Sequence, residues 1–570
     1  MESLESSYTE SGPIENVIQG DLWREVIKPK FAGKTVLPLG FNFDDYETAW
    51  ELGTHTGVYK LGAGYLQILS LPPTFRSALE NIFLVLLIHS GDRVLGNQKV
   101  FRKVIEEFKF LEKVGIPVKT SEGVTQVYFA LELVFGDNLG ANGILGFVES
   151  FRANFYCTIC HVEYSAARTL TRAIAAKMRN IENYESDLSK NDESKTGVKE
   201  RCVFNEVESF HCARNFHLDL MHDQDEGTVK YVMYGIIKYL FDKKRFDIDQ
   251  LNELIQGFYY GAEEKNRLPS ITYDDLCKSK RLRISASEAR CLVRYFGLMA
   301  GHLVKEEDRE VWDLYLKARS VMDFVTAPVV FAEDLSRLRD LIEEHHTLFQ
   351  RIFETHLRPK FHLMLHEPDV MKLLGPLEFL SCYRTESKHT EGKEIARRSN
   401  NRVNLPFTIA KRHQLKLAFR LLCRRGFNVR FKFSKLRYQH VEKLPNFAKF
   451  RTAIPPEKIA EWSTAKWVEI NGTKYCLEYV VLVSLSSDQV PLFGQIRVIL
   501  ISEQKAHFVL ELLDVIQFDE HFYAYETRLS DKWLFVESST LLSHLPTNIR
   551  LLANGKSYVP FRFSVKTLRK

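Results

Sequence analysis

Long hydrophobic runs are missing from this chain of 570 residues. The longest apolar run, at 82–88, has seven residues, whereas about 20 are needed to cross a bilayer. The N-terminus is acidic and polar, without the basic and apolar regions of a signal peptide. We therefore expect no membrane association and a location in the nucleus or cytoplasm, where the nine cysteines stay reduced.

Several catalytic motifs are missing as well. The sequence has no Gly-x-Ser-x-Gly, no Walker loop and no Gly-x-Gly-x-x-Gly. Serine hydrolases, P-loop kinases and dinucleotide-dependent enzymes therefore find no support. The net charge of only +5 excludes a polycation that coats nucleic acid.

Positive charge is nevertheless concentrated in one stretch. Residues 391–440 hold 14 Lys and Arg against two acids, a net charge of +12, so the remainder of the chain carries −7. The part from Ala410 to Cys423 fits an amphipathic basic helix. Either a solvated helix face or a surface that neutralises DNA phosphates would explain this pattern. The candidate DNA contacts are Arg397, Arg398, Lys411, Arg412, Arg424 and Arg425.

Hydrophobic periodicity predicts an α/β protein with a different tail. Strands are expected over 36–45, 58–71 and 126–134, and helices over 74–88, 98–114 and from 141 to 150, with a surface loop over 183–200. Further helices are expected over 228–242, 247–258, 286–303, 306–325 and 332–355. From 467 to 565 the pattern of short strands predicts a small all-β barrel or sandwich.

Four acids lie where predicted elements end or begin. Asp44 and Asp45 close one predicted strand, Asp137 closes another, and Glu386 enters a predicted helix. Carboxylates on neighbouring strands and a helix can hold two Mg²⁺ or Mn²⁺ ions about 3.5–4 Å apart for phosphodiester cleavage. Each acid alone could equally cap a turn or a helix, as could the acids of the segment 217–227.

A second candidate site contains sulfur and imidazole ligands. Cys157-Thr-Ile-Cys160 is a Cys-x-x-Cys pair, and His211 and His222 follow about fifty residues later. These four residues could close a tetrahedral site for a structural zinc ion. Two ordinary buried thiols would be the alternative.

Several blocks together resemble the transposases of invertebrate CACTA-type (En/Spm-like) DNA transposons. They are Phe41-Asn-Phe-Asp-Asp-Tyr-Glu, Gly136-Asp-Asn-Leu-Gly, Tyr156-Cys-Thr-Ile-Cys, Asp219-Leu-Met-His, Lys360-Phe-His-Leu-Met-Leu-His and Tyr383-Arg-Thr-Glu-Ser-Lys-His. The blocks occur in order between about residues 35 and 430. Because the chain begins close to the first strand, it resembles an N-terminally short copy or a domesticated derivative.

The resemblance implies a ribonuclease H-like catalytic core with an Asp, Asp, Glu triad formed by Asp44, Asp137 and Glu386, with Asp45 as a rival for the first acid. A large, mainly helical insertion would interrupt this core, and a small all-β domain would follow it. The expected segments are a leader (1–34), the first part of the core (35–150), a Cys/His element (151–227), the helical insertion (228–358), the end of the core (359–400), a basic helical segment (401–450) and the β-rich domain (460–566). The partners would be double-stranded DNA and transposon ends, and the resemblance leaves a homo-oligomer open.

Three functions are compatible with these features. The first is a Mg²⁺-dependent transposase or nuclease that cuts phosphodiesters and joins strands. The second is a catalytically inactive, transposase-derived protein that binds DNA or chromatin. The third, a cytosolic scaffold with no nucleic-acid role, is disfavoured by the clustered positive charge and by the ordered acidic blocks.

Overall fold

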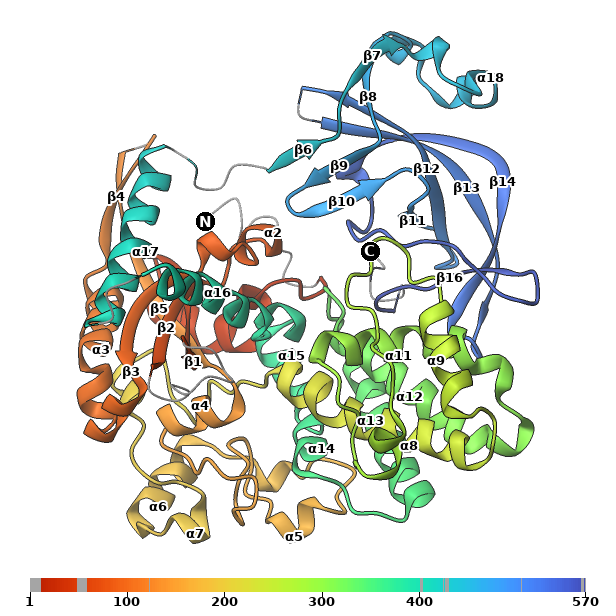
Figure 1. Ribbon diagram of the computed structural model, residues 1–570. Coiled ribbons are helices and arrows are strands. Elements are labelled where there is room, and N and C mark those ends of the chain that lie inside the picture. The colour runs from red at the N-terminus through yellow and green to blue at the C-terminus, as the bar shows by residue number, and fades with distance from the viewer. Residues whose placement is uncertain are drawn as a thin grey trace. The chain divides into compact units, whose positions relative to one another are not determined.

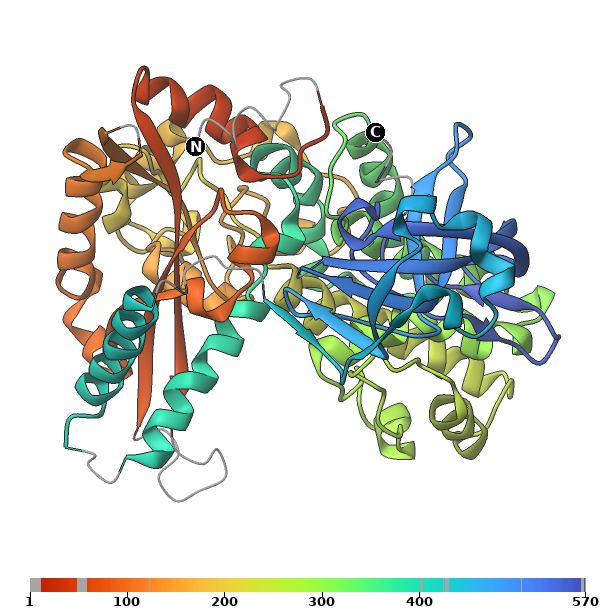
Figure 2. The same cartoon turned by 90° about the horizontal axis from the view of Figure 1, so that it is seen from above.

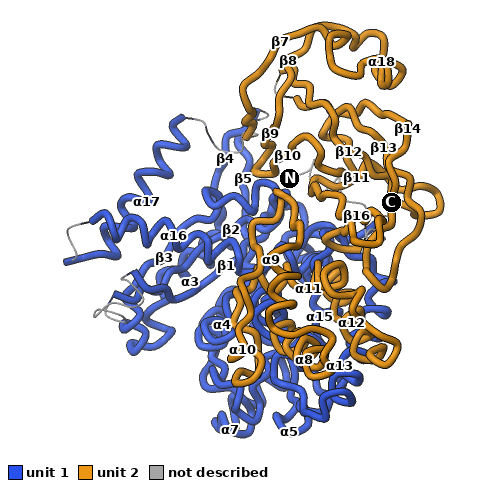
Figure 3. The backbone as a smooth tube through the Cα atoms, turned by 45° about the vertical axis from the view of Figure 1, so that its right-hand side comes forward, with its two compact units in different colours: residues 1–228, 325–426 blue, residues 229–324, 427–570 orange. Residues whose placement is uncertain are grey.

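The computed structural model describes residues 12–48, 59–121, 123–399, 403–423, 425, 430–503, 505–564 and 568. The chain forms two compact units (Figure 3). The first unit combines Met1–Thr228 with Val325–Gly426, and the second combines Val229–Phe324 with Phe427–Lys570. Each unit is therefore built from two stretches that are distant in sequence.

The first unit is built on a five-stranded mixed sheet with the order β3-β2-β1-β5-β4 (Figure 1). Its strands are β1 Thr35–Glu47, β2 Lys60–Ile68, β3 Phe83–His89, β4 Ile116–Thr120 and β5 Gly123–Phe135. β1, β2 and β3 are antiparallel, whereas β5 runs parallel to β1 and β4 is antiparallel to β5. β1 is thus the central strand.

The two faces of this sheet carry different cores, because successive side chains of a strand point in opposite directions. Phe41 and Phe43 of β1 pack with Phe101 of α3 (Asn97–Lys113). Tyr46 packs on the other face, in a cluster with residues of α16 (Tyr383–Arg398) and α17 (Leu405–Leu422). The teal helices α16 and α17 run beside the strands in Figure 2. Odd-numbered residues near the end of β1 therefore face α3, and even-numbered residues face α16.

The remaining α-helices described in the first unit are short, apart from α13. They are α2 Pro73–Arg76, α4 Asn138–Ile144, α5 Tyr164–Ala167, α6 Ile181–Lys190, α7 Glu193–Thr196, α13 Asp334–Phe353, α14 Pro359–Met364 and α15 Glu367–Leu374. A π-helical segment, η8, spans Met221–Thr228. The three predicted strands and the helix predicted over 98–114 are confirmed as β1, β2, β5 and α3.

Three predictions in this unit are wrong. The helix expected from 141 to 150 is α4, which begins at Asn138 and already ends at Ile144. The helix expected over 74–88 ends at Arg76, and the apolar run becomes β3, which pairs with β2. A short apolar run fits a buried strand as well as a helix, so periodicity alone could not decide. The loop expected over 183–200 contains α6 and α7 instead. Asn180 begins α6 with a capping box that it shares with Asn183, a start signal that compensates for weak periodicity.

The second unit begins with a helical layer whose prediction is confirmed, except for the short helix α10, which was not predicted. Its α-helices are α8 Val229–Asp242, α9 Ile248–Gly257, α10 Tyr273–Cys277, α11 Ala286–Ala300 and α12 Arg309–Val325. The last helix of the predicted insertion, α13, belongs instead to the first unit. The helical insertion expected over 228–358 is therefore divided near residue 325.

The rest of the second unit is the expected all-β region. Its strands are β6 Phe431–Phe433, β7 Arg437–His440, β8 Glu461–Ala465, β9 Trp467–Ile470, β10 Thr473–Cys476, β11 Val480–Leu485, β12 Pro491–Ser502, β13 Lys505–Asp519, β14 Ala524–Glu537, β15 Arg550–Leu551 and β16 Ser557–Val559. The larger sheet has the order β15-β16-β14-β13-β12-β8-β7, with β11 beside β12, and β10-β9-β6 form a smaller sheet. The order is open among the described strands, so the sheet is not a closed barrel.

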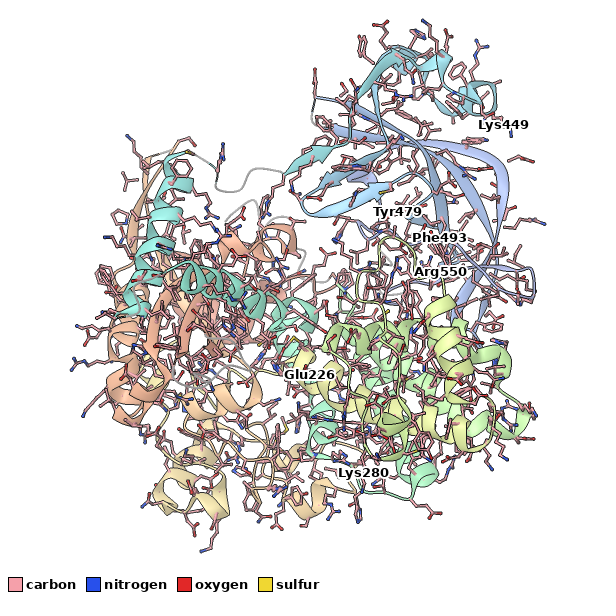
Figure 4. All side chains as sticks on the ribbon, viewed as in Figure 1. Glu226, Lys280, Lys449, Tyr479, Phe493 and Arg550 are labelled. Atoms are coloured by element: carbon pink, nitrogen blue, oxygen red, sulfur yellow. The ribbon has the colours of Figure 1, made fainter. Side chains whose placement is uncertain are left out.

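A buried ion pair fixes the helical layer to this β region inside the second unit. Arg550 of β15, labelled in Figure 4, donates hydrogen bonds to the Tyr260 carbonyl at 2.6 Å and to Glu263 at 2.9 Å. The side chains of Arg550 and Glu263 are 1% and 4% exposed. The β-rich tail is therefore one body with α8 to α12.

Candidate functional site

The alternation of side chains on β1 separates the two candidates for the first acid. Asp45 is on the same face as Phe43, where Ser90 donates a hydrogen bond to it at 2.7 Å and Arg93 forms an ion pair at 3.4 Å. Asp44 is on the α16 face, where an oxygen of its carboxylate lies 3.7 Å from Nδ1 of His389. Asp45, predicted as a cofactor-binding residue, is thus turned away from the α16 face, and Asp44 is placed to act with Glu386.

The position of Asp137 relative to Asp44 follows from the parallel pairing of β1 with β5. Asn42 is level with Phe135 in this register, so Asp44 lies two residues further along β1 and Asp137 lies two residues past the end of β5. Asp137 is the N-cap of α4, and its carboxylate accepts a 2.6 Å hydrogen bond from the Gly140 amide. The capping alternative for Asp137 is therefore correct, and it leaves the second carboxylate oxygen available for another interaction.

Glu386 reaches the same place from α16. It lies in the first turn of this helix, and its side chain is 40% exposed. We call Asp44, Asp137 and Glu386 the acid cluster, because their charges act on one another. Burial, followed by repulsion from the carboxylates of Asp137 and Glu386, raises the pKa of Asp44 to about 7. The three predicted acids are thus gathered from two strand ends and one helix.

A histidine lies between the acid cluster and a fully buried carboxylate. His222 Nδ1 contacts Asp219, and its Nε2 is 3.3 Å from Oε1 of Glu386. Burial opposes the charge on His222, but the hydrogen bonds to Asp219 and Glu386 outweigh it and raise the pKa to about 11. His222 is therefore an imidazolium that orients Glu386. The prediction that His222 binds zinc together with Cys157 and Cys160 is therefore wrong.

The two cysteines meet a different pair of histidines. Cys160 Sγ lies 3.1 Å from His362 Nε2, and Cys157 Sγ lies 3.6 Å from His366 Nε2. All four side chains are buried, and their ligand atoms lie within 4.8 Å of one another. Two thiolates and two imidazoles are the donor set of a tetrahedral structural zinc site, so this group fits such an ion.

His211, the other predicted zinc ligand, is also elsewhere. Its Nε2 is 3.2 Å from Asn205 Nδ2, and its Nδ1 accepts a hydrogen bond from the Ala213 amide. Sequence proximity to Cys160 favoured His211 and His222, whereas the ligands found in space lie about two hundred residues downstream. One pattern in the sequence could have identified the correct histidines. It is the spacing His362-x-x-x-His366, because such pairs are typical of zinc sites.

Four of the six predicted DNA contacts lie on two helices of the first unit. Arg397 and Arg398 end α16, and Lys411 and Arg412 lie in α17; all four are exposed and have no ion pair within the described part of the chain. Arg425 is exposed too, whereas Arg424 lies outside the described residues. Because α16 also carries Glu386, unpaired positive charge occurs on the helix that completes the acid cluster.

Comparison with known proteins adds no assignment. No protein-family model matches the chain, and none of the curated proteins matches it. Among the helices that could be described, none combines the length and apolar character needed to cross a membrane.

Proposed function

We propose that this chain is a DNA transposase, or a derivative of one, that cuts phosphodiesters and joins strands by metal-dependent chemistry. One observation carries the proposal: the parallel register of β1 and β5 puts Asp44 level with Asp137, and α16, which carries Glu386, packs against the Asp44 face of β1. The charges of Asp137 and Glu386 accordingly raise the pKa of Asp44. Carboxylates that repel one another are typical of divalent-cation sites, where the ion offsets their repulsion.

The arrangement of the sheet also supports a ribonuclease H-like core. The first acid lies on a central strand that is antiparallel to β2 and parallel to β5. The second acid follows β5, and the third lies on a helix packed against β1. This is the arrangement that the resemblance to CACTA-type transposases implies for Asp44, Asp137 and Glu386.

The proposed activity assigns a different role to each group of residues. Asp44, Asp137 and Glu386 would hold one or two Mg²⁺ or Mn²⁺ ions, which activate a water or hydroxyl and stabilise the leaving oxygen. The Gly140 amide fixes the Asp137 carboxylate, and the His222 imidazolium orients Glu386. The exposed cations of α16 and α17 would bind DNA phosphates, which makes binding weaker at high salt.

Nicking of supercoiled plasmid DNA in Mg²⁺ or Mn²⁺ tests this function. We expect Asp44→Asn, Asp137→Asn and Glu386→Gln each to reduce the rate by about 100-fold or more, since a lost metal ligand removes several kcal/mol of charge stabilisation. Asp45→Asn is the matched control, because it changes the adjacent carboxylate on the opposite face and is expected to keep activity.

Two outcomes would argue against this proposal. Equal inertness of the wild type and Asp137→Asn would leave the alternative of an inactive DNA- or chromatin-binding protein, whose affinity falls with salt and survives loss of the acids. Loss of activity in Asp45→Asn, with normal activity in Asp44→Asn, would show that the first acid is wrongly assigned.

A further inference from the structure

A second group of metal-binding side chains lies beside the acid cluster. It consists of His217, Asp219 and Cys382, whose ligand atoms all lie within 4.8 Å of one another. Asp219 and Cys382 are buried, and His217 is half-buried. Neither the proposed phosphodiester chemistry nor the Cys157/Cys160/His362/His366 site makes use of His217 or Cys382.

The state of His217 is the first reason to expect a ligand here. Neither ring nitrogen has a hydrogen-bond partner in the described structure, although both atoms are inaccessible to solvent. Leaving a buried polar group unpaired costs about 1–3 kcal/mol, and the edge-on contact with the Phe135 ring does not compensate for this. An imidazole in this state is well suited to coordinate a metal ion, since histidine is the commonest metal ligand in proteins.

Space and charge are the second reason. A small cavity of about 30 Å³ is lined by His217 and Asp219, which is enough for one water molecule. The Cys382 sulfur lies within the electrostatic influence of Asp44, Asp219 and Glu386. A cation at this point would therefore be attracted by three carboxylates against the single positive charge of His222. A water in the cavity could complete its coordination.

We propose that His217, Asp219 and Cys382 bind a second transition-metal ion, of the zinc class, separate from the Cys157/Cys160/His362/His366 site. One sulfur, one nitrogen and one oxygen donor suit zinc better than Mg²⁺, which prefers oxygen ligands. Zinc–ligand distances of about 2.0–2.3 Å require only a modest contraction of the group.

Such an ion would act on the acid cluster through existing contacts. Asp219 accepts a hydrogen bond from the Cys382 amide at 2.9 Å and also contacts His222, which in turn contacts Glu386. A metal bound to Asp219 would hold this row of side chains in place. His217 and Cys382 would then be positioning residues, because they act on Glu386 only through Asp219 and His222.

Counting tightly bound zinc in the purified chain tests the proposal. Native mass spectrometry and elemental analysis would be run in excess Mg²⁺ on the Asp137→Ala background, so that the acid cluster does not add to the count. We expect two zinc ions per chain. His217→Ala and Cys382→Ser should each retain one, Cys160→Ala should lose the other, and His211→Ala is the matched control that keeps both.

The proposal would be overturned by a count of one zinc ion in the Asp137→Ala background alone, or by a count of two after His217→Ala is added. The cavity beside His217 would then hold only water. Should the variants fail to fold, X-ray absorption at the zinc edge of the unsubstituted chain decides instead. Two zinc sites predict an average near 1.5 sulfur ligands per zinc, whereas the Cys157/Cys160 site alone predicts 2. Both readouts are independent of plasmid nicking, so failure of this site and failure of the proposed enzymatic activity can be told apart.

Discussion

At the scale of single residues, Asp44 makes the stability of the metal-free protein depend on pH. Its pKa is about 7 in the folded chain and near 3.8 in the unfolded one. The folded state therefore binds more protons between these values, and stability falls as the pH rises from 4 to 7. Above pH 7 the ionised carboxylate remains beside Asp137 and Glu386 at full energetic cost.

Replacing Asp44 by Asn removes this cost. We expect metal-free Asp44→Asn to be more stable than the wild type, by a margin that grows by about 2–3 kcal/mol between pH 5 and pH 8. Denaturant unfolding at the two pH values measures this margin. A margin that does not change with pH would contradict the electrostatic coupling, and saturating Mg²⁺ should reduce the margin at pH 8 by stabilising the wild type alone.

At the scale of elements, the Cys/His group joins the segment around Cys157 to α14 and α15. We expect chelation of zinc, or Cys160→Ala, to lower the free energy of unfolding by about 4 kcal/mol if the free zinc concentration is 1,000-fold above Kd. Thermal melting with and without chelator measures this loss. His211→Ala should melt like the wild type and remain sensitive to chelator; equal melting of the chelated and zinc-loaded wild type would rule out a structural zinc ion.

The helix α17 supports a second prediction at this scale. Lys411→Gln combined with Arg412→Gln removes two exposed charges, so we expect the slope of log K against log salt to become shallower by about 2 for duplex DNA. Fluorescence anisotropy over a salt series gives the slope. Lys416→Gln is the matched control because Lys416 is already paired with Glu391 at 2.7 Å, and an equal effect in the control would argue against a phosphate contact.

The sequence predicted most of the long elements of both units and the residues of the acid cluster, but not the histidines of the Cys/His group. Periodicity located β1, α3, α8, α9, α11, α12 and α13, since each buries one regular face. It misassigned β3, where a continuous apolar run has no period. Among the ligands, the two cysteines were found because they are only three positions apart, whereas His362 and His366 approach them only through tertiary folding.

At the scale of the whole molecule, the second unit depends on contacts between stretches that are far apart in sequence. We expect Arg550→Ala to destabilise this unit by about 3–5 kcal/mol, because it leaves Glu263 as an unpaired buried charge. Unfolding followed by tryptophan fluorescence measures the loss. Arg528→Ala, in a 3.4 Å exposed pair with Asp514, is the matched control and should change stability by less than about 1 kcal/mol; similar effects of both would show that Arg550 does not anchor the β region.

The division of the first unit into two stretches sets an order of events during synthesis. Cys160 is made 202 residues before its partner His362, an interval of roughly 10–40 s at usual translation rates. Throughout that interval Asp44 and Asp137 exist without Glu386, which follows still later. A nascent or prematurely terminated chain therefore carries only part of the acid cluster, so the proposed cleavage of DNA would require most of the chain to have left the ribosome.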